Sequence, residues 1–298
     1  PLLDSANMGM EDWARIAEDI AAEYERYDAF VVIHGTDTMA YSASALSFML
    51  ENLEKPVIFT GSQLPLGQTL NDAFDNLLGA LTIAGHYEVP EVCLYFAHRL
   101  LRGNRATKVD ASGFDAFATG NYPPLVEAGV EIEVNWDAVR PRDAGIFRVH
   151  ARMDPHVASL RIFPGITTEI LSNFLRPPVK GVVIETYGAG NAPDRRQDLL
   201  AALREAADRG VVIVNCTQCL RGRVVETYAA GSALAAAGVI GGADMTTEAA
   251  LTKLSSLLGR GLPTDAVRRL MRHDLRGELK EPTDVTRYSF RPPPQGAT

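Results

Sequence analysis

Apolar residues follow two kinds of spacing along the first hundred residues. Helical spacing, with charged residues between the apolar ones, occurs at 10–27, 39–52 and 70–84. Short continuous runs rich in Val, Ile and Phe, typical of strands buried on both faces, occur at 29–35, 55–61 and 91–97. Strands and helices that alternate at this spacing predict a mostly parallel sheet with helices on both faces.

The helix expected at 70–84 should pack through its large apolar side chains, which are Phe74, Leu77, Leu78 and Leu81. The alternation of strands and helices is interrupted over 99–150, where Gly and Pro clusters leave only weak strand signals such as 130–134.

Alternation resumes beyond a boundary expected near 150–156. Strands are expected at 157–163, 181–188 and 211–216, and helices at 167–175, 197–209, 246–258 and 264–274. The pattern therefore predicts an α/β protein with a larger N-terminal domain over 1–150 and a smaller C-terminal α/β domain over 156–298.

Charge and composition narrow the class of partner. The chain has 298 residues with 29 basic and 37 acidic side chains, a net charge of −8, so neither nucleic acid nor an anionic membrane is expected as a partner. No apolar run approaches the ~20 residues of a membrane helix. Three cysteines are too few for a disulfide scaffold, which favours a reducing, cytoplasmic location.

Several common enzyme signatures are missing. The sequence has no GxGxxG after a strand, no GxxxxGK[ST], no GxSxG and no HExxH. Cys216 and Cys219 form a CxxC, but no helix start follows and no further ligands are suitably spaced, so we expect structural thiols and no metal. His34, at a strand end, is interpreted as a core or bend residue.

The strongest candidate site is VVIHGTDTMAYSA (31–43), where a strand ends at Gly35 and Thr36, Asp37 and Thr38 precede a helix. Ligands of open α/β sheets bind just outside the carboxyl ends of strands. Helix capping would explain one of these polar residues. Three polar residues after a Gly are more than helix capping requires. The TGSQ turn at 60–63 follows a second, parallel strand and adds polar groups at that strand end.

Two further segments contain candidate chemistry. Asp4 and Ser5 precede the first helix and are suited either to cap it or to bind a small polar ligand. Lys108 lies in an irregular polar stretch after the strand at 91–97. A lysine in such a stretch is usually only a solvated surface charge. The functional alternative is a lysine near Asp37 and a hydroxyl, which would activate that hydroxyl by lowering its pKa, and sequence spacing alone does not establish that meeting.

Taken together, the sequence resembles the type I (cytoplasmic) branch of the bacterial-type L-asparaginases. The resemblance is carried by LLDSANM, VVIHGTDTMAYSASALSFMLE, KPVIFTGSQLPLG, RGNRATKVDASGFDAFATGNYPPLVEAG, ETYGAGNAP, VVIVNCTQC and GVIGGADMTTEAALTKL. It implies a doubly wound N-terminal α/β domain, a smaller C-terminal α/β domain, and hydrolysis of L-asparagine to L-aspartate and ammonia without a metal or organic cofactor. It also implies a homo-oligomer, either a dimer or a dimer of dimers, with sites at the subunit interface.

The resemblance also implies roles for individual residues. Thr36, Asp37 and Lys108 match the catalytic Thr–Asp–Lys set. The residues implied in substrate binding are Asp4, Ser5, Ala6, Gly35, Ser62 and Asn191, the last offered to a neighbouring subunit. These roles suit a small zwitterion, because Asp37 can pair with the α-ammonium while Ser5 and backbone N–H groups hold the α-carboxylate. Lys108 can stabilise the deprotonated Thr36 hydroxyl, and backbone N–H groups can stabilise the oxyanion.

This sequence departs from the family pattern in two places. The family has an N-terminal strand ending in a TGGTI-like motif, whose Thr is the covalent nucleophile, and then a mobile lid. Neither occurs in these 298 residues, so an upstream segment is expected and the acyl-enzyme residue is unassigned. Some type I enzymes also have an effector site for asparagine; Thr107, Cys219 and Thr247 match it, but Glu185 replaces an arginine, which should oppose an anionic effector.

Two other functions stay open at this stage. One is the amidase subunit of a glutamyl-tRNA amidotransferase, which would feed ammonia to a partner. The other is a sensor that binds asparagine or aspartate without turnover.

Overall fold

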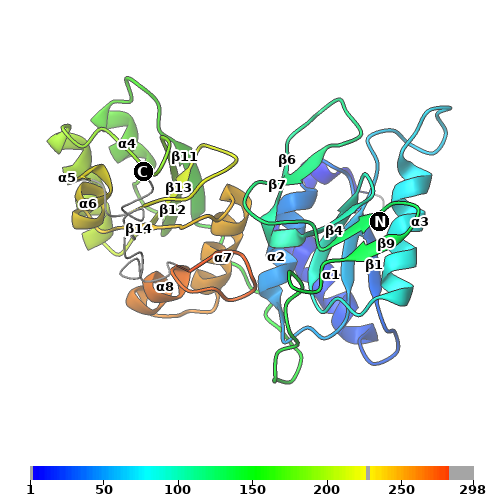
Figure 1. The fold of residues 1–298 in the computed structure, drawn as a ribbon. Helices are drawn as coiled ribbons and strands as arrows, with labels where there is room; N and C mark the ends of the chain where they lie inside the picture. Colours follow the sequence, from blue (N-terminus) through cyan, green and yellow to red (C-terminus); the bar gives the residue numbers. More distant parts are fainter. Residues whose placement is uncertain (1–2, 226–228, 282–298) are drawn as a thin grey trace, which may run out of the picture.

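The computed structural model describes residues 3–225 and 229–281 and contains two α/β regions, each built on its own sheet (Figure 1). The expected C-terminal domain extends to 298, so its last 17 residues, 282–298, lie outside the described part.

The N-terminal sheet has six strands in the order β1-β3-β4-β5-β8-β9. Its parallel half consists of β1 (Phe30–Ile33), β3 (Val57–Thr60) and β4 (Val92–Phe96). Its antiparallel half consists of β5 (Arg99–Arg102), β8 (Val126–Ala128) and β9 (Ile132–Val134). The parallel half brings the carboxyl ends of β1 and β3 side by side, because Ile33 pairs with Thr60.

Helices cover both faces of this sheet, because alternate strand residues point to opposite sides. Phe59 and Leu94 join a core with α1 (Met10–Glu23) and α2 (Met39–Met49). Their neighbours Ile58 and Cys93 join a second core with α3 (Ala73–His86).

Two expectations for these elements are wrong. β3 and β4 are buried throughout, but β1 is an edge strand, in which Phe30, Val31 and Val32 are only partly buried and Ile33 is 73% exposed. The helix α3 buries Asn76, Ala80 and Ile83 instead of the predicted apolar face. Phe74, Leu78 and Leu81 are 62%, 52% and 51% exposed.

Residues 99–150 form more strands than their sequence suggested. Besides β5, β8 and β9, this region contains β6 (Ala106–Lys108), β7 (Phe117–Thr119) and β10 (Arg148–Val149). The remaining short elements are η1 (Ser5–Asn7), β2 (Leu50–Glu51) and η2 (Gly103–Arg105). Strands of two to four residues contain too few positions to display an alternating pattern.

The C-terminal sheet is fully parallel, with strand order β11-β12-β13-β14. Its strands are β11 (Val157–Arg161), β12 (Gly181–Thr186), β13 (Val212–Thr217) and β14 (Val239–Gly241). Its helices are α4 (Thr168–Phe174), α5 (Gln197–Asp208), α6 (Ala229–Ala236), α7 (Thr247–Gly259) and α8 (Thr264–Met271). Of these elements, β14 and α6 were not predicted.

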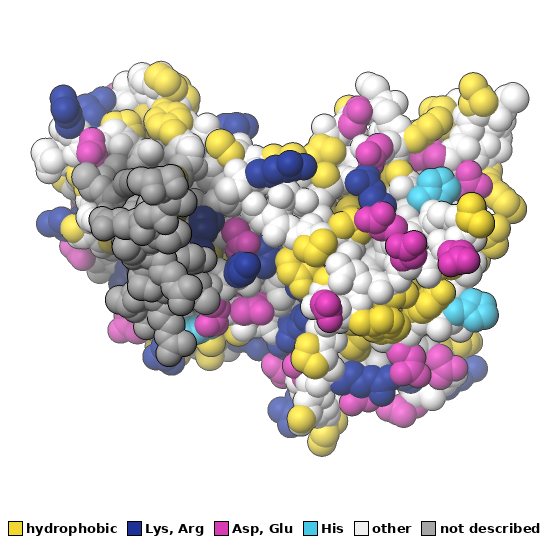
Figure 2. Space-filling view, in the orientation of Figure 1, with side chains coloured by type: hydrophobic (Ala, Val, Ile, Leu, Met, Phe, Trp, Pro, Cys, Tyr) yellow, Lys and Arg dark blue, Asp and Glu magenta, His cyan; other side chains and the backbone are white. Residues whose placement is uncertain are grey.

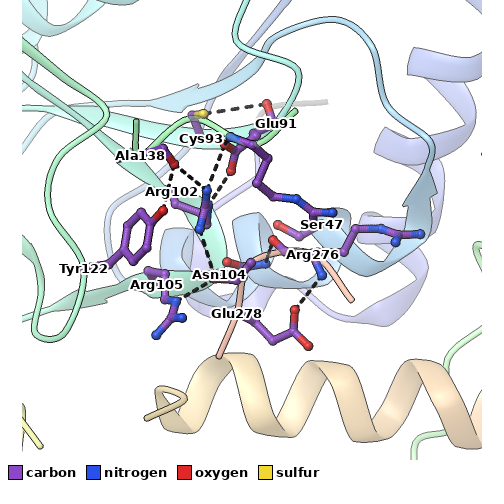
Figure 3. A network of polar contacts seen from close by, with 12 residues as sticks. Ser47, Glu91, Cys93, Arg102, Asn104, Arg105, Tyr122, Ala138, Arg276 and Glu278 are labelled. Atoms are coloured by element: carbon purple, nitrogen blue, oxygen red, sulfur yellow. Dashed lines mark hydrogen bonds and ion pairs between the residues drawn. The ribbon is translucent and has the colours of Figure 1, made fainter. Parts of the chain in front are cut away.

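The two domains meet along α2 and α7, and a segment after α8 strengthens the contact. This segment, residues 272–281, is called the strap below. The Gly277 carbonyl accepts hydrogen bonds from Arg102 (3.2 Å) and Arg105 (2.6 Å) of the N-terminal domain. Arg102 also points toward Glu91, with which it forms a buried ion pair, and toward the Ala138 carbonyl (Figure 3). The strap therefore anchors the C-terminal domain to the antiparallel half of the first sheet.

Candidate functional site

Thr36 and Asp37 lie in the turn between β1 and α2, at the carboxyl end of the parallel strands. Neither residue is the N-cap of α2. That position belongs to Thr38, whose hydroxyl donates to the Ser5 carbonyl (2.8 Å) and does not cap the helix. Capping therefore does not account for Thr36 or Asp37.

Lys108, at the end of β6, reaches both of these residues across more than 70 positions of sequence. Its Nζ donates to Thr36 Oγ1 at 2.8 Å and pairs with Asp37 Oδ1 at 2.7 Å. The Lys108 side chain is 20% exposed and that of Asp37 is 65% exposed, so the cluster stays open to solvent. The structure thus brings together all three expected catalytic residues.

Gln63 completes the hydrogen bonding of Thr36 and was missed by the sequence reasoning. Its Nε2 donates to the Gly113 carbonyl (3.1 Å), which leaves Oε1 to accept the Thr36 hydroxyl (3.0 Å). Because the Thr36 proton points to Gln63, the oxygen offers lone pairs to Lys108. The only sequence signal for Gln63 was its place in the TGSQ turn.

Two polar residues hold the TGSQ turn in place: Asp72, the N-cap of α3, and Asn76 within this helix. Asp72 accepts hydrogen bonds from the backbone N–H groups of Gln63 and Leu64, at 3.0–3.1 Å. Asn76, buried beneath the turn, donates to Asp72 Oδ2 and to the Gly61 carbonyl, both at 3.0 Å. These bonds position Gln63 before any ligand arrives.

Ser5 lies directly beside Gly35. A Cβ at position 35 would fall 2.6 Å from Ser5 Oγ, so only glycine permits this approach. Asp4 is exposed and caps the short helix η1 by accepting the Ala6 N–H (3.0 Å). The expected binding loop is therefore placed against the turn that contains Thr36.

Ser62 faces a cavity of about 440 Å³ that runs along the outer edge of β1. Gly35, Gly61, Ile33 and Met8 also line this cavity. Within residues 3–225 and 229–281, β1 pairs with β3 alone, so its other edge leaves backbone groups available beside the site.

Asn191 is not brought to this cluster. It lies in the loop between β12 and α5, exposed, and forms backbone hydrogen bonds with Tyr187 at 2.8 and 2.9 Å. None of its hydrogen bonds in the described part of the chain reaches Thr36, Asp37 or Lys108.

The four residues expected at an effector site, Thr107, Glu185, Cys219 and Thr247, line one cavity of about 490 Å³. Residues of both domains form its wall, and the space-filling view shows a hollow between the two lobes of the molecule (Figure 2). Glu248, which the sequence reasoning did not identify, adds a second carboxylate and accepts the Thr107 hydroxyl at 2.5 Å. Burial raises the pKa of Glu248 and raises that of nearby Tyr41 to about 12.

Cys93 and Cys216 are buried, as expected of structural thiols, whereas Cys219 is exposed. All three are free, and burial raises the pKa of the Cys216 thiol to about 12, so it is not a ready nucleophile. Among the described residues, no group of three or more His, Cys, Asp or Glu side chains is arranged to hold a metal ion. Nor does any described helix combine the length and apolarity needed to cross a bilayer.

The cluster can bind and polarise a small charged molecule. Asp37 presents an exposed carboxylate to a cation, and the Lys108 ammonium stabilises negative charge on Thr36 Oγ1. Such a lysine-supported hydroxyl is suited to moving a proton to or from a reacting group.

Comparison with known proteins gives matches over both domains. The family model "Asparaginase, N-terminal" matches residues 1–140, and "Glutaminase/Asparaginase C-terminal domain" matches residues 156–271. The chain is 54% identical to L-asparaginase 1 of Escherichia coli K12 over 280 residues, 94% of this chain and 82% of that protein. It is 52% identical to the mouse 60 kDa lysophospholipase over 96% of this chain, but it spans only 51% of that relative's length.

A solved structure agrees with these sequence matches. The crystal structure of L-asparaginase I from Vibrio cholerae superimposes with a TM-score of 0.89 at 50% identity, covering 94% of this chain and 84% of that one.

Proposed function

The chain belongs to the asparaginase family of amide hydrolases, and we propose that it hydrolyses L-asparagine to L-aspartate and ammonia. The observation that carries this proposal is the contact of Lys108 Nζ with both Thr36 Oγ1 and Asp37 Oδ1. This contact places a cation, a hydroxyl and a carboxylate within one substrate length of each other at a strand end.

Each group has a role in this reaction. Asp37 binds the substrate α-ammonium in a charge-assisted contact, and Ser5 with the backbone near Gly35 receives the α-carboxylate. These contacts hold the side-chain amide against Thr36. Thr36, supported by Lys108, takes a proton from the attacking group and delivers one to the leaving ammonia.

We propose that a threonine hydroxyl attacks the amide carbon and forms an acyl-enzyme, which water then hydrolyses. The free edge of β1 and the cavity beside Ile33, Gly35 and Ser62 support delivery of that hydroxyl by a strand paired to β1. Thr36 then acts as the proton-transfer residue.

The working enzyme is proposed to be a homo-oligomer with sites at subunit interfaces. The exposed apolar stripe of Phe74, Leu78 and Leu81 on α3 supports a subunit contact, because such patches are uncommon on monomers. Asn191, remote from the Thr36 cluster in its own chain, is then free to serve a neighbouring subunit. The three free cysteines support a cytoplasmic location.

The cavity between the domains is proposed not to respond to asparagine. Glu185 and Glu248 contribute two carboxylates. Of the three cations among the described lining residues, Arg105 and Lys108 are already paired with carboxylates, and Arg161 lies opposite Glu185 in the register of β11 and β12. An asparagine carboxylate would therefore be repelled. The expected rate curve against asparagine is hyperbolic, and a sigmoidal curve would contradict this proposal.

The main test is ammonia release from L-asparagine by purified protein of verified intact mass, measured beside Thr36→Ala. The matched control is Thr82→Ala, because the Thr82 hydroxyl bonds only within α3, to the Leu78 carbonyl (2.8 Å). When the measured mass includes the upstream segment expected from the family pattern, we expect turnover by the parent and by Thr82→Ala, and a loss of at least ~10²-fold in Thr36→Ala.

The alternatives give different results. Binding of asparagine or aspartate without turnover, in protein that includes the expected upstream segment, would favour a sensor. Co-purification with a tRNA-binding partner would favour an amidotransferase subunit.

A further inference from the structure

A chain of buried hydrogen bonds connects the interior of α1 to the turn that contains Thr36. Trp13 Nε1 lies 2.8 Å from Ser42 Oγ, and Ser42 Oγ lies 2.9 Å from His34 Nε2. His34 Nδ1 in turn lies 2.6 Å from the Gly35 carbonyl oxygen. Trp13, Ser42 and His34 are 9%, 0% and 7% exposed.

The chemistry of the two ends fixes the direction of the two outer bonds, and a neutral imidazole fixes the direction of the bond between Ser42 and His34. An indole N–H only donates, and a carbonyl oxygen only accepts. His34 must therefore donate through Nδ1–H to Gly35, and as a neutral ring it accepts the Ser42 hydroxyl at Nε2. Ser42 in turn accepts from Trp13. Burial lowers the pKa of His34, which agrees with a neutral ring.

This chain determines which way the Gly35–Thr36 peptide faces. In a planar trans peptide the C=O and the following N–H point in opposite directions. Because the Gly35 carbonyl points to His34, the Thr36 N–H points away from it. Neither Thr36 N–H nor Asp37 N–H donates to another group in the described part of the chain. Two backbone donors therefore remain available beside the Thr36 hydroxyl.

We propose that His34 is a positioning residue, whose Nδ1–H holds the Gly35 carbonyl inward so that the Thr36 N–H is aimed at the oxyanion formed during amide hydrolysis. This inference rests on the proposed function. It assigns to His34 a role beyond the core residue inferred from sequence, and none in proton transfer. A donor aimed at the transition state changes kcat more than KM.

Two substitutions of His34 separate positioning from packing. His34→Asn places an amide N–H near the Nδ1 position, where it can still donate to Gly35. His34→Gln is the larger side chain, but its amide lies near the Nε2 position and loses that contact. We expect His34→Gln to lower kcat for asparagine at least ~10-fold with KM within ~2-fold, and His34→Asn to stay within ~3-fold of the parent. If His34 acted through packing alone, His34→Gln would keep more activity than His34→Asn, because the glutamine side chain fills more of the space.

A second pair of variants uses serines of the same helix. Ser42→Ala removes the donor to His34 Nε2, whereas Ser47→Ala removes only a bond to the Ala43 carbonyl within α2. We expect kcat to fall ~3- to 10-fold in Ser42→Ala and to stay unchanged in Ser47→Ala. Equal effects in this pair, or in the His34 pair, or an effect confined to KM, would overturn the inference.

A measurement that does not depend on turnover keeps this inference separate from the proposed function. In protein labelled with ¹⁵N-histidine, NMR at neutral pH should show the proton of His34 on Nδ1 and none on Nε2. A ring with its proton on Nε2 and none on Nδ1 would overturn the positioning role even in an active enzyme. If the parent with the expected upstream segment releases no ammonia, the proposed function fails, and the tautomer still decides whether this hydrogen-bond chain exists as described.

Discussion

Two lysine–carboxylate ion pairs in this chain have similar lengths and opposite surroundings. Lys108 and Asp37 are 2.7 Å apart, with side chains 20% and 65% exposed. Lys253 and Glu278 are 2.5 Å apart, and both are 0% exposed. The first pair contacts a hydroxyl at a strand end, and the second fastens the strap to α7. The comparison shows that burial, more than distance, decides what an ion pair does.

The buried pair is completed by backbone groups. Lys253 also donates to the His273 carbonyl (2.6 Å), and Glu278 accepts the N–H groups of Leu275 and Arg276 at 2.6–3.1 Å. Burial opposes ionisation of Glu278, but the Lys253 charge and these bonds hold the pKa of Glu278 below its usual value. The ammonium and the carboxylate of this pair are bonded to each other and to backbone groups, so the pair stabilises the fold and does not bind a ligand. Asp37, in contrast, remains accessible to a ligand.

Removing the exposed cation should give the largest change in activity. Lys108→Ala leaves Thr36 without the charge that stabilises its oxyanion form, and we expect kcat/KM for asparagine to fall ~10³-fold or more. The unfolding free energy should change by less than ~1 kcal/mol, because the Asp37 carboxylate left behind is 65% exposed. The control is Lys180→Ala, which breaks another 2.7 Å Lys–Asp pair whose lysine side chain is 55% exposed. Comparable activity losses in the two variants would contradict the assigned role of Lys108.

Removing the buried anion should give the largest change in stability. Glu278→Gln leaves Lys253 charged and unpaired in the interior, which should lower the free energy of unfolding by about 3–5 kcal/mol. Urea denaturation followed by circular dichroism measures this loss. Glu205→Gln breaks the exposed pair with Arg209 and should cost less than ~0.5 kcal/mol. A Glu278→Gln protein as stable as this control would show that the strap contributes little.

The smallest expected effect is a change in stability at Asp274, which lies beside the buried pair, and this change depends on pH. Burial and the neighbouring Glu278 charge raise the pKa of Asp274 to about 6. Protonated Asp274 is therefore favoured in the folded state, so its contribution to stability is full below about pH 4 and is lost as pH rises through about 6. Asp274→Asn imitates the protonated form and keeps an acceptor for the Gly277 N–H.

The Asp274→Asn variant should consequently be more stable than the parent by about 1 kcal/mol at pH 7. The amount is modest because the residue as a whole stays accessible to solvent, although its carboxyl group contacts Gly277 and Glu278 of the strap. The difference should disappear at about pH 4. Urea midpoints at the two pH values measure it, and a variant destabilised at pH 7 would show that the Asp274 charge is useful.

The sequence predicted the long, regular parts of this fold well. The helices α1, α2, α5 and α7 have enough residues to display a period, and the buried strands β3, β4, β12 and β13 stand out as continuous apolar runs. The face of α3 could not be predicted in this way, because large apolar residues were assumed to point inward. Asn76 is buried there instead, since its amide satisfies Asp72 and the Gly61 carbonyl.

The candidate site was only partly visible in the sequence. Thr36 and Asp37 were indicated by their place after a strand, but the meeting with Lys108 was implied by the family resemblance alone. This contact depends on how the chain places β6 beside the turn between β1 and α2, and the local sequence pattern does not encode that placement. Gln63 and Glu248 act through side-chain contacts between distant segments, and nothing in their neighbourhoods distinguishes them from surface polar residues.

The helix α2 links these regions in one further way. Ten of its 11 residues are buried, and most are alanine or serine. Its first turn follows Thr38, one side contains Ser42, and another packs against α7. Larger side chains are therefore unfavourable on three sides of this helix. An added methylene would displace the reactive turn, the hydrogen-bonded interior or the second domain. Its amide hydrogens should be among the last in the chain to exchange with solvent.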